Sequence, residues 1–461
     1  MAGRRFLLLL LLIAVAGLGL RVAYVLGAKR HDPLKGDQIY YSALADTLAD
    51  GGGFRDPFIT DRVVPSADHP PLTSIVATPA SWIVGTDGDP DGRILGHRLT
   101  MAFVGAGAVV AIGFAGRRVA GPTAGLVAAG VAAVYPGFWI NDGLVMAESI
   151  GTLTIAVVIL TAYRALDRPS IVNMGLLGAA ISLCGLARAE TLLLLPLLGL
   201  PVAWRARRGT DGSRLGALAG AVASIGVGAV LVLGPWVGPN LVRFEEPVTM
   251  STNDGLTLIG NACDAAFFGP SRGFWIFSCI GVVDSDGDGI DDWDEYLAGT
   301  LEPPEGGDWS TVSAGWREAA FDYFGDHLGD LPAVVMVREL RGWGLWSPSE
   351  MVFYNTGEGR ESWAGWAATV GWWIVAPAGL AGLVVLRRRR REIWPLVAQL
   401  VTTALTLGAF YGLMRFRIGA EVAMVIATGA LVAHLIQRWL AGGPEGGNAG
   451  SDDATPESMT A

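Results

Sequence analysis

The pattern with the most specific chemistry in this chain is an acidic loop over residues 284–295. Carboxylates alternate along its first half, a glycine stands at the sixth position, and a glutamate stands at the twelfth. This spacing is typical of calcium loops, because the glycine allows a sharp turn and the last glutamate binds with both oxygens. A merely solvated acidic loop would need neither residue there. We therefore expect a structural Ca²⁺ site with ligands from Asp284, Asp286, Asp288, Ile290 (through its carbonyl), Asp292 and Glu295.

Three arginines stand at the ends of apolar runs, where charge is costly unless it is paired or functional. Arg188 lies between two such runs with Glu190 beside it, and Arg415 and Arg417 lie between the last two runs. Arg188 could pair with Glu190 and fasten two helices, or its guanidinium could bind phosphate oxygens. Arg415 and Arg417 could bind phosphate in the same way, or they could extend toward lipid headgroups.

The composition places these residues in a membrane protein. Of 461 residues, 51% are hydrophobic and only 16% are charged, and the mean hydropathy is +0.44. These values nearly exclude a soluble enzyme. Apolar runs of about 18 to 22 residues recur, and each can cross a bilayer core of roughly 30 Å as a helix. We predict an all-α polytopic membrane protein with about ten transmembrane helices, near residues 6–26, 99–116, 119–138, 148–163, 171–187, 189–204, 215–238, 364–386, 393–413 and 418–440.

Arginine clusters predict how these helices are oriented in the plasma membrane. The clusters that begin at Arg4, Arg117, Arg164, Arg205 and Arg387 all fall on one side, which the positive-inside rule makes cytoplasmic. Both termini then lie in the cytoplasm. We expect the first span to be retained, because no small-residue cleavage site of a signal peptide ends it.

The same topology divides the chain into four parts. An N-terminal membrane module covers 1–238 and includes an outside loop at 27–97, and an acidic outside domain covers 239–363. C-terminal membrane helices follow at 364–440, and the composition of the tail at 441–461 is typical of disorder.

The outside domain is acidic and carries two of the three cysteines. It holds 22 of the 43 acidic residues, and the net charge of the whole chain is -10, so nucleic-acid binding is improbable. Cys263 and Cys279 are 16 positions apart in this domain, whereas Cys184 falls in a span. In an oxidising exterior we expect the first two to form a disulfide.

Several short motifs follow one another along the chain. Asp37 begins a segment with helical apolar spacing at Ile39, Tyr40, Ala43, Leu44 and Leu48, and a glycine-rich turn and the sequence His69-Pro70-Pro71-Leu72 come next. Glu148 then opens the fourth span, Arg188 and Glu190 follow the fifth, and Arg415-Phe416-Arg417 precedes the last. This ordered set resembles the GT-C superfamily of polyprenyl-phosphate-dependent glycosyltransferases. Within it, the similarity is greatest to the protein mannosyltransferase and aminoarabinose transferase group (family 39-like) of bacteria, especially actinobacteria. It covers roughly the first 240 residues well.

The resemblance implies a membrane enzyme that moves a hexosyl or pentosyl group from a polyprenyl-phosphate donor. The acceptor would be a glycan, lipid or protein of the cell envelope, and the active site would face the extracytoplasmic side. Asp37 would be the general base that takes the proton of the acceptor hydroxyl; a helix N-cap is the alternative from position alone. Gln38 follows Asp37 where protein mannosyltransferases usually carry Glu, which argues against a strict protein O-mannosyltransferase.

The resemblance also implies roles for other residues. Glu148 would be a second acid that orients the acceptor or holds a divalent cation near the phosphate, or else a carboxylate favoured by a helix N-terminus; Asp142 is a weaker candidate. Arg188 and Arg417 would bind the donor phosphate. The remaining expected substrate contacts are Glu190, Arg415, His69 and Tyr40. His69 could bind the acceptor or a metal, although a lone histidine is more often structural.

Two other functions remain open. The chain could be a transporter or flippase of lipid-linked sugars, or a non-catalytic assembly protein that uses the calcium domain for binding. The spans are nearly free of charge at mid-depth, which argues against a transporter.

Overall fold

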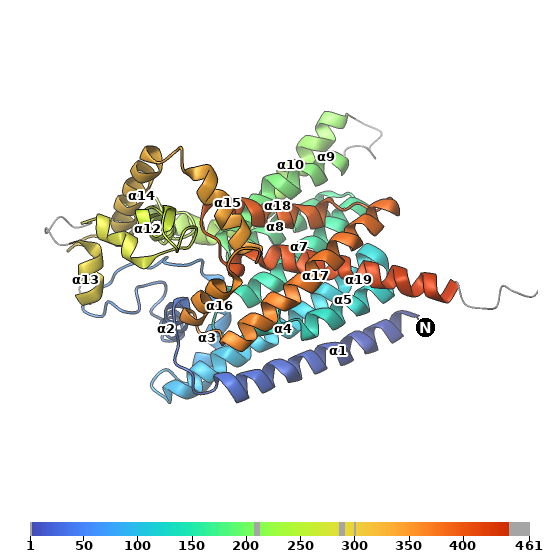
Figure 1. Ribbon diagram of the computed structural model, residues 1–461, viewed down its shortest axis with the longest axis horizontal. Coiled ribbons are helices and arrows are strands. Elements are labelled where there is room, and N and C mark those ends of the chain that lie inside the picture. Colours follow the sequence, from blue (N-terminus) through green and yellow to red (C-terminus); the bar gives the residue numbers. More distant parts are fainter. Residues whose placement is uncertain (1, 207–212, 285–290, 299–300, 442–461) are drawn as a thin grey trace, which may run out of the picture.

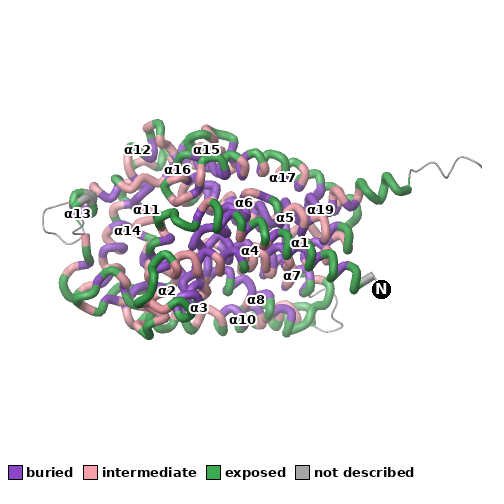
Figure 2. Tube along the Cα trace, turned by 90° about the horizontal axis from the view of Figure 1, so that it is seen from below, coloured by how far each residue is buried: buried purple, intermediate pink, exposed green. Residues whose placement is uncertain are grey.

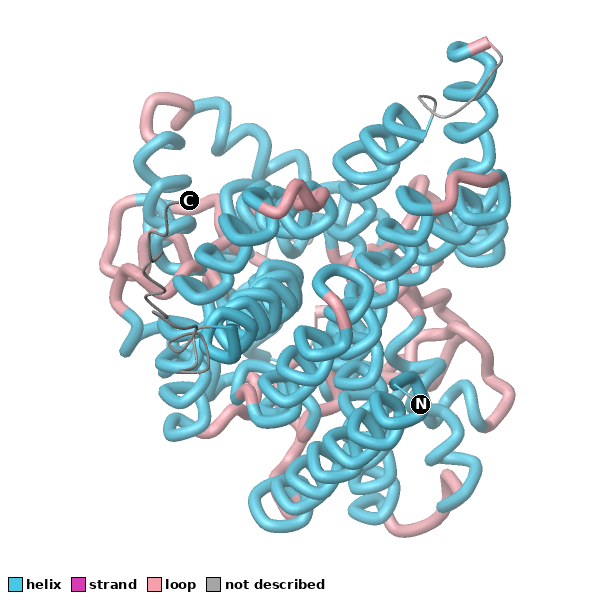
Figure 3. The backbone as a smooth tube through the Cα atoms, turned by 90° about the vertical axis from the view of Figure 1, so that its right-hand side faces the viewer, coloured by secondary structure: helices cyan, strands magenta, loops and turns pink. Residues whose placement is uncertain are grey.

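The computed structural model describes residues 2–206, 213–284, 291–298 and 301–441. Over these ranges the regular structure is helical, with no strand and a single isolated bridge between Arg55 and Pro65 (Figure 3). The predicted all-α polytopic class is confirmed. The tail at 442–461 lies outside the described residues.

Six helices in the described ranges are long and apolar enough to cross a membrane, and a bent pair adds a seventh candidate. The pair meets at 54° because Pro136 interrupts the helix and Tyr135 before it is extended. The six are α1 (Ala2–Tyr24, continued by the π-helical turn η1, Val25–Lys29), α4 (Pro90–Ala120), α7 (Ala147–Asp167), α10 (Arg214–Arg243), α17 (Ser362–Arg388) and α19 (Ile418–Ala441), and the bent pair is α5 (Pro122–Val134) with α6 (Pro136–Asp142).

The other expected spans are helical but shorter or broken. The segments at 171–187 and 393–413 become α8 (Ile171–Gly185) and α18 (Trp394–Ala409). The segment at 189–204 is divided into η2 (Ala189–Leu193), η3 (Leu195–Gly199) and α9 (Leu200–Ala206). Pro196 and Pro201 lie in the broken segment, and proline cannot supply an N–H to a continuous helix. The number of helices that cross the membrane therefore stays a prediction.

The bundle is built around α4, α7 and α19, which bury most of their apolar residues, whereas α1, α10 and α17 leave apolar side chains exposed at the periphery (Figure 2). Small residues allow close helix packing. A Cβ atom on Gly178 of α8 would lie 2.0 Å from the Ile225 carbonyl oxygen of α10, and one on Gly228 would lie 2.0 Å from that of Gly175. Helices in a bilayer pack closely through such residues, since lipid supplies no hydrophobic drive between them.

Arginines of the basic clusters on different helices meet carboxylates at one end of the bundle. There Arg118 pairs with Asp167 at 2.8 Å, Arg205 pairs with Glu392, and the Tyr163 hydroxyl donates to the Glu392 carbonyl. The N-terminus and the last turns of α19 lie toward this end, and α2 (Asp37–Ala49) and α3 (Leu72–Val84) lie at the other (Figure 1). The basic clusters are thus separated from the loop at 27–97, as the predicted topology requires, and which side of the membrane each end faces stays a prediction.

The acidic segment between α10 and α17 is helical and lies at the same end as α2. It has a small core of its own around Ile259, Val312 and Trp316, and the structure joins Cys263 to Cys279 by a disulfide. Its helices are α11 (Asp254–Ile259), α12 (Asp264–Phe267), η5 (Phe277–Val282), α13 (Asp292–Ala298), α14 (Trp309–Asp326), α15 (Leu331–Gly342) and α16 (Pro348–Gly357).

Candidate functional site

Asp37 lies at the start of α2, where the chain turns sharply. Gly36 takes the N-cap position with φ of 57°, a conformation that favours glycine, and Asp37 is the first helical residue. Gly36 has no side chain that could cap the helix, and the Asp37 carboxylate instead lies within ion-pair distance of Arg415 and His69. Tyr41 and Leu44 bury α2 in a cluster with Ala147 and Ala187, the residues directly before Glu148 and Arg188. This packing brings the three expected site residues together.

The helix face of α2 differs slightly from the predicted one. Ile39, expected on the apolar face, is 45% exposed, whereas the polar Gln38 is fully buried. Gln38 donates from Nε2 to the Glu358 carbonyl at 2.9 Å and accepts from the Val145 amide at 3.3 Å. A glutamate at this position could only accept when ionised, so the Asp-Gln pair suits this contact better than Asp-Glu.

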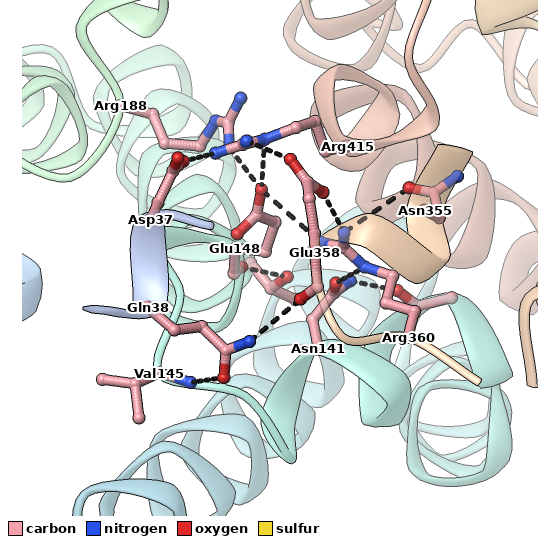
Figure 4. Close-up of polar contacts among 12 residues, drawn as sticks. Asp37, Gln38, Asn141, Val145, Glu148, Arg188, Asn355, Glu358, Arg360 and Arg415 are labelled. Atoms are coloured by element: carbon pink, nitrogen blue, oxygen red, sulfur yellow. Dashed lines mark hydrogen bonds and ion pairs between the residues drawn. The ribbon is translucent and has the colours of Figure 1, made fainter. Parts of the chain in front are cut away.

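Arg415 is the centre of the site (Figure 4). Its three guanidinium nitrogens each meet a different carboxylate: Nη2 lies 2.6 Å from Asp37 Oδ2, Nε lies 2.9 Å from Glu148 Oε1, and Nη1 lies 2.5 Å from Glu358 Oε1. Arg415 comes from η6 (Met414–Arg417), Asp37 from α2, Glu148 from the first turn of α7, and Glu358 from the α16–α17 loop. One side chain therefore joins four distant segments.

Arg188 forms a second ion-pair centre beside the first. Its Nη1 lies 2.9 Å from Glu148 Oε1 and its Nε lies 2.6 Å from Glu190 Oε1. The guanidinium also lies over the Phe416 ring, 5.2 Å from the ring centre. The expected ion pair of Arg188 with Glu190 is thus present, and the same guanidinium also contacts Glu148.

Glu358 and Arg360 belong to this cluster and were not expected from the sequence. Arg360 pairs with Glu358, donates from Nε to Asn141 Oδ1 at 2.9 Å, and has Nη2 3.9 Å from Glu148 Oε1. For Arg360 the sequence held a usable signal, because it stands just before an apolar run, as Arg415 does.

His69 lies between two carboxylates. Its Nε2 is 3.7 Å from Asp37 Oδ1 and 3.4 Å from Asp68 Oδ2, and its ring stacks on Tyr41 at 4.9 Å. Tyr40 contacts the histidine ring edge-on, but its hydroxyl bonds Ser66 Oγ at 2.8 Å. The structure thus brings His69 close to Asp37, whereas the Tyr40 hydroxyl is bonded to the loop that contains Ser66.

The pKa values of the two carboxyl groups beside His69 are shifted in opposite directions. Burial acts to raise the pKa of Asp37, but the charges of Arg415 and His69 outweigh it and hold that pKa well below its usual range. Burial raises the pKa of Asp68, against the charge of His69 and with a further contribution from Asp37. Neighbouring carboxyls whose pKa values are driven apart are typical of acid–base sites.

Arg417 and Asp142 are not part of this cluster. Arg417 is buried, with Nε 2.8 Å from Glu421 Oε1 and its guanidinium over the Trp372 ring at 4.6 Å. Residues two apart in a 3₁₀ turn project in different directions, so Arg415 and Arg417 cannot both face Asp37. Asp142 forms a buried pair with Arg21 at 2.5 Å.

The calcium loop is only partly described. Asp286, Asp288 and Ile290 lie outside the described residues, and Asp284 is exposed. Asp292 and Glu295 are buried in α13, where Asp292 accepts a hydrogen bond from Trp316 Nε1. Within the described ranges no group of three or more His, Cys, Asp or Glu side chains could hold a metal ion. The site stays a prediction.

A small cavity lies beside Arg188, between α7, α18 and α19. Its volume is about 20 Å³, which is room for about one water molecule. Gln399 Nε2 and Thr402 Oγ1 on its wall are buried and make no hydrogen bond within the described part of the chain. The other polar lining residues are Arg188, Glu190, Thr191, Thr403 and Thr406.

No protein-family model matches this chain, and no curated protein matches it in sequence. Its fold is similar to solved structures of the oligosaccharyltransferase of Archaeoglobus fulgidus. The crystal structure of that enzyme with Zn and sulfate gives a TM-score of 0.54 at 14% identity, over 94% of this chain and 49% of that one.

The structure of the archaeal oligosaccharyltransferase AglB with an inhibitory peptide and a dolichol-phosphate gives a TM-score of 0.54 at 16% identity, over 95% of this chain and 51% of that one. ArnT from Cupriavidus metallidurans, bound to undecaprenyl phosphate, overlaps more weakly, at a TM-score of 0.40 and 16% identity, over 92% of this chain and 77% of that one. This chain thus spans about half the length of the oligosaccharyltransferases it matches, and what it shares with them is the fold of a polytopic, helical membrane protein.

Proposed function

We propose that this protein is a membrane glycosyltransferase that moves a sugar from a polyprenyl-phosphate donor to an acceptor hydroxyl. The observation that carries the proposal is Arg415, which holds Asp37 and Glu148 at one end of a helical membrane bundle. This reaction needs a carboxylate that accepts the proton of the acceptor hydroxyl and guanidinium groups that bind the phosphate. AglB, which has a similar fold, was solved with a dolichol-phosphate, and this supports a lipid phosphate as the ligand.

Each group has a defined part in the reaction. Asp37 takes the proton of the acceptor hydroxyl while the hydroxyl oxygen forms a bond to the anomeric carbon of the sugar. The bond from that carbon to the phosphate oxygen breaks at the same time. The polyprenyl phosphate leaves with the electron pair, so a strong general acid is not required. Arg415 and Arg188 stabilise the charge that develops on the phosphate. Glu148 holds both arginines in place, 2.9 Å from each.

The membrane side of the reaction belongs to the same proposal. We place the Asp37 end of the bundle on the extracytoplasmic face and both termini in the cytoplasm, because the arginine-rich ends of the helices lie opposite Asp37. The transferred group is a hexose or pentose, and the acceptor is a component of the cell envelope.

Membranes that contain the protein should consume labelled polyprenyl-phosphate sugar, and matched membranes without it should not. The expected products are labelled acceptor, or free sugar from slow hydrolysis, together with polyprenyl phosphate. Thin-layer chromatography of the lipid fraction measures them. Movement of the unchanged donor across proteoliposome membranes would favour the flippase reading instead, and neither consumption nor binding of the donor would favour an assembly protein.

We also propose that 284–295 binds a structural calcium ion. Extracellular calcium modules bind with dissociation constants of about 10⁻⁴ to 10⁻³ M. Millimolar Ca²⁺ should therefore raise the melting temperature of the purified protein by a few degrees over EGTA, since a ligand of the folded state stabilises it. Asp288→Asn should reduce this shift, and Mg²⁺ in place of Ca²⁺ is the control. Equal melting temperatures in Ca²⁺ and EGTA would contradict the site.

A further inference from the structure

The site already holds more negative than positive side chains, so a bound phosphate would be repelled by the carboxylates. The cluster joins four carboxylates to three guanidinium groups, so carboxylates are in excess by one. A phosphate would add one or two further negative charges to a poorly hydrated place, where they repel the carboxylates strongly. One carboxylate must therefore give way when the donor binds. The carboxylates are Asp37, Glu148, Glu190 and Glu358, and the guanidinium groups are Arg188, Arg360 and Arg415.

Glu358 is the carboxylate placed to give way. Its two oxygens bridge two guanidinium groups: Oε1 lies 2.5 Å from Arg415 Nη1, and Oε2 contacts Arg360 Nη1. Two phosphate oxygens can bridge a pair of arginines in the same manner. Glu148, by contrast, is completely buried and is held by Arg188 as well as Arg415. The Glu358 side chain is 17% exposed, so it has a route to water.

The backbone around Glu358 is fixed, so only its side chain needs to move. Gln38 donates to the Glu358 carbonyl at 2.9 Å, and the Lys29 ammonium donates to the Gly359 carbonyl. Gly359 turns the chain with φ of 90°. Asn141 then holds Arg360 at 2.9 Å, so that guanidinium stays in the site if Glu358 rotates away.

Two buried atoms lack hydrogen bonds in this part of the site. Arg360 Nη2 and Glu148 Oε2 have no hydrogen-bond partner within the described residues, although Arg360 is only 3% exposed and Glu148 is completely buried. Other arginines of the described chain also have a buried N–H group without a partner, but this one belongs to the guanidinium that Glu358 contacts, and it could donate to a further acceptor there. A phosphate oxygen beside Arg360 would supply it.

We propose that Arg360 and Arg415 form the binding site for the phosphate of the donor, and that the Glu358 carboxylate occupies this site until the donor displaces it. The inference rests on the proposed function, because it takes the ligand to be a lipid phosphate. Exchange of Glu358 for phosphate leaves Arg415 in contact with Asp37 and Glu148, so the base stays beside the bound donor.

The test is the affinity of the full-length protein for undecaprenyl phosphate in detergent. Glu358→Gln, which keeps the shape and removes the charge, should bind about tenfold more tightly than wild type, because the competing carboxylate is gone. Arg360→Gln should bind at least about tenfold more weakly. Glu350→Gln is the matched control: it removes one negative charge from nearby α16, where Glu350 pairs with Arg341 instead, and should leave the affinity unchanged.

Four further measurements make the outcome decisive. Undecaprenol, which lacks the phosphate, should bind equally to all four proteins, and competition by inorganic phosphate tells whether the lipid chain is needed. Glu358→Asp, which retains the charge on a shorter side chain, should lie between wild type and Glu358→Gln. Melting temperatures establish that the variants fold.

Unchanged or weaker binding by a folded Glu358→Gln, with undecaprenyl phosphate still bound by wild type, overturns the exchange and leaves the proposed function standing. If wild type binds undecaprenyl phosphate no better than undecaprenol, the proposed function fails together with this inference.

Discussion

Asp37→Asn is expected to abolish sugar transfer while the protein folds and binds its donor. Asparagine has the same shape but accepts no proton, and a positioned general base contributes about 10²- to 10⁴-fold to a rate. We therefore expect kcat to fall by that factor. The side chain is 25% exposed and one of three carboxylates on Arg415, so its loss leaves Arg415 paired with Glu148 and Glu358. Transfer assays at matched protein amounts, with melting temperatures alongside, measure the two effects separately.

Asp68→Asn is the matched control for this result. Asp68 lies on the other side of His69, with Oδ2 3.4 Å from Nε2, and has no ion pair with Arg415. If Asp37 is the base, Asp68→Asn should lose no more than a few-fold in kcat, through a poorer position of His69. If instead Asp68→Asn is inactive and Asp37→Asn retains most of the rate, the base is Asp68, whose raised pKa would suit that role.

The sequence was sufficient for the helical architecture, because long apolar runs leave few alternatives to a helix in a membrane. All ten expected spans coincide with helical segments, and the short helix at Asp37 begins where the glycine before it allows a turn. Where a span ends or breaks depends on single residues and packing. The run at 189–204 is apolar after Thr191, yet its prolines divide it into short helical pieces.

The site was only partly predictable, since its contacts join residues far apart in the chain. Asp37 and Glu148 were selected because the ordered motifs resemble a known family. Arg188 and Arg415 could be selected because each borders an apolar run. Arg417 satisfied the same criterion, and only the direction of its side chain in a 3₁₀ turn sends it to Glu421 instead.

Glu358 was not predictable by this reasoning. No local pattern distinguishes it from the other 21 acidic residues of the segment 239–363. Its part in the site follows from the approach of the α16–α17 loop to α2, which only the fold determines.

Arg415→Gln is expected to destabilise the protein more than any other single change in the site. Arg415 is 11% exposed and forms ion pairs with three carboxylates, of which Glu148 is completely buried. Removal of one partner from a buried ion pair costs about 3–5 kcal/mol, because the remaining charge is left uncompensated. Arg317→Gln is the control: its pair with Asp254 at 2.8 Å is largely exposed, and such pairs contribute about 0–1 kcal/mol. Thermal unfolding of both variants in the same detergent measures the difference, and equal stabilities would contradict the central role of Arg415.

The pH dependence of the surviving activity then distinguishes an electrostatic role of Arg415 from a structural one. A general base must be ionised, so activity falls as the pH drops through the pKa of Asp37. In wild type Arg415 and His69 hold that pKa well below its usual range, so Asp37 should cause no loss of rate at pH 5. Without Arg415, the effect of burial on the Asp37 pKa is opposed chiefly by His69, and this pKa should rise to or above the ordinary value of about 4.

The acid limb of kcat should therefore move to higher pH in Arg415→Gln and return toward the wild-type position in Arg415→Lys. A lysine restores the charge beside Asp37 but not the three-way fork, so it should recover the pH profile better than the stability. An acid limb that stays in place in Arg415→Gln would show that Arg415 does not set the charge state of the base.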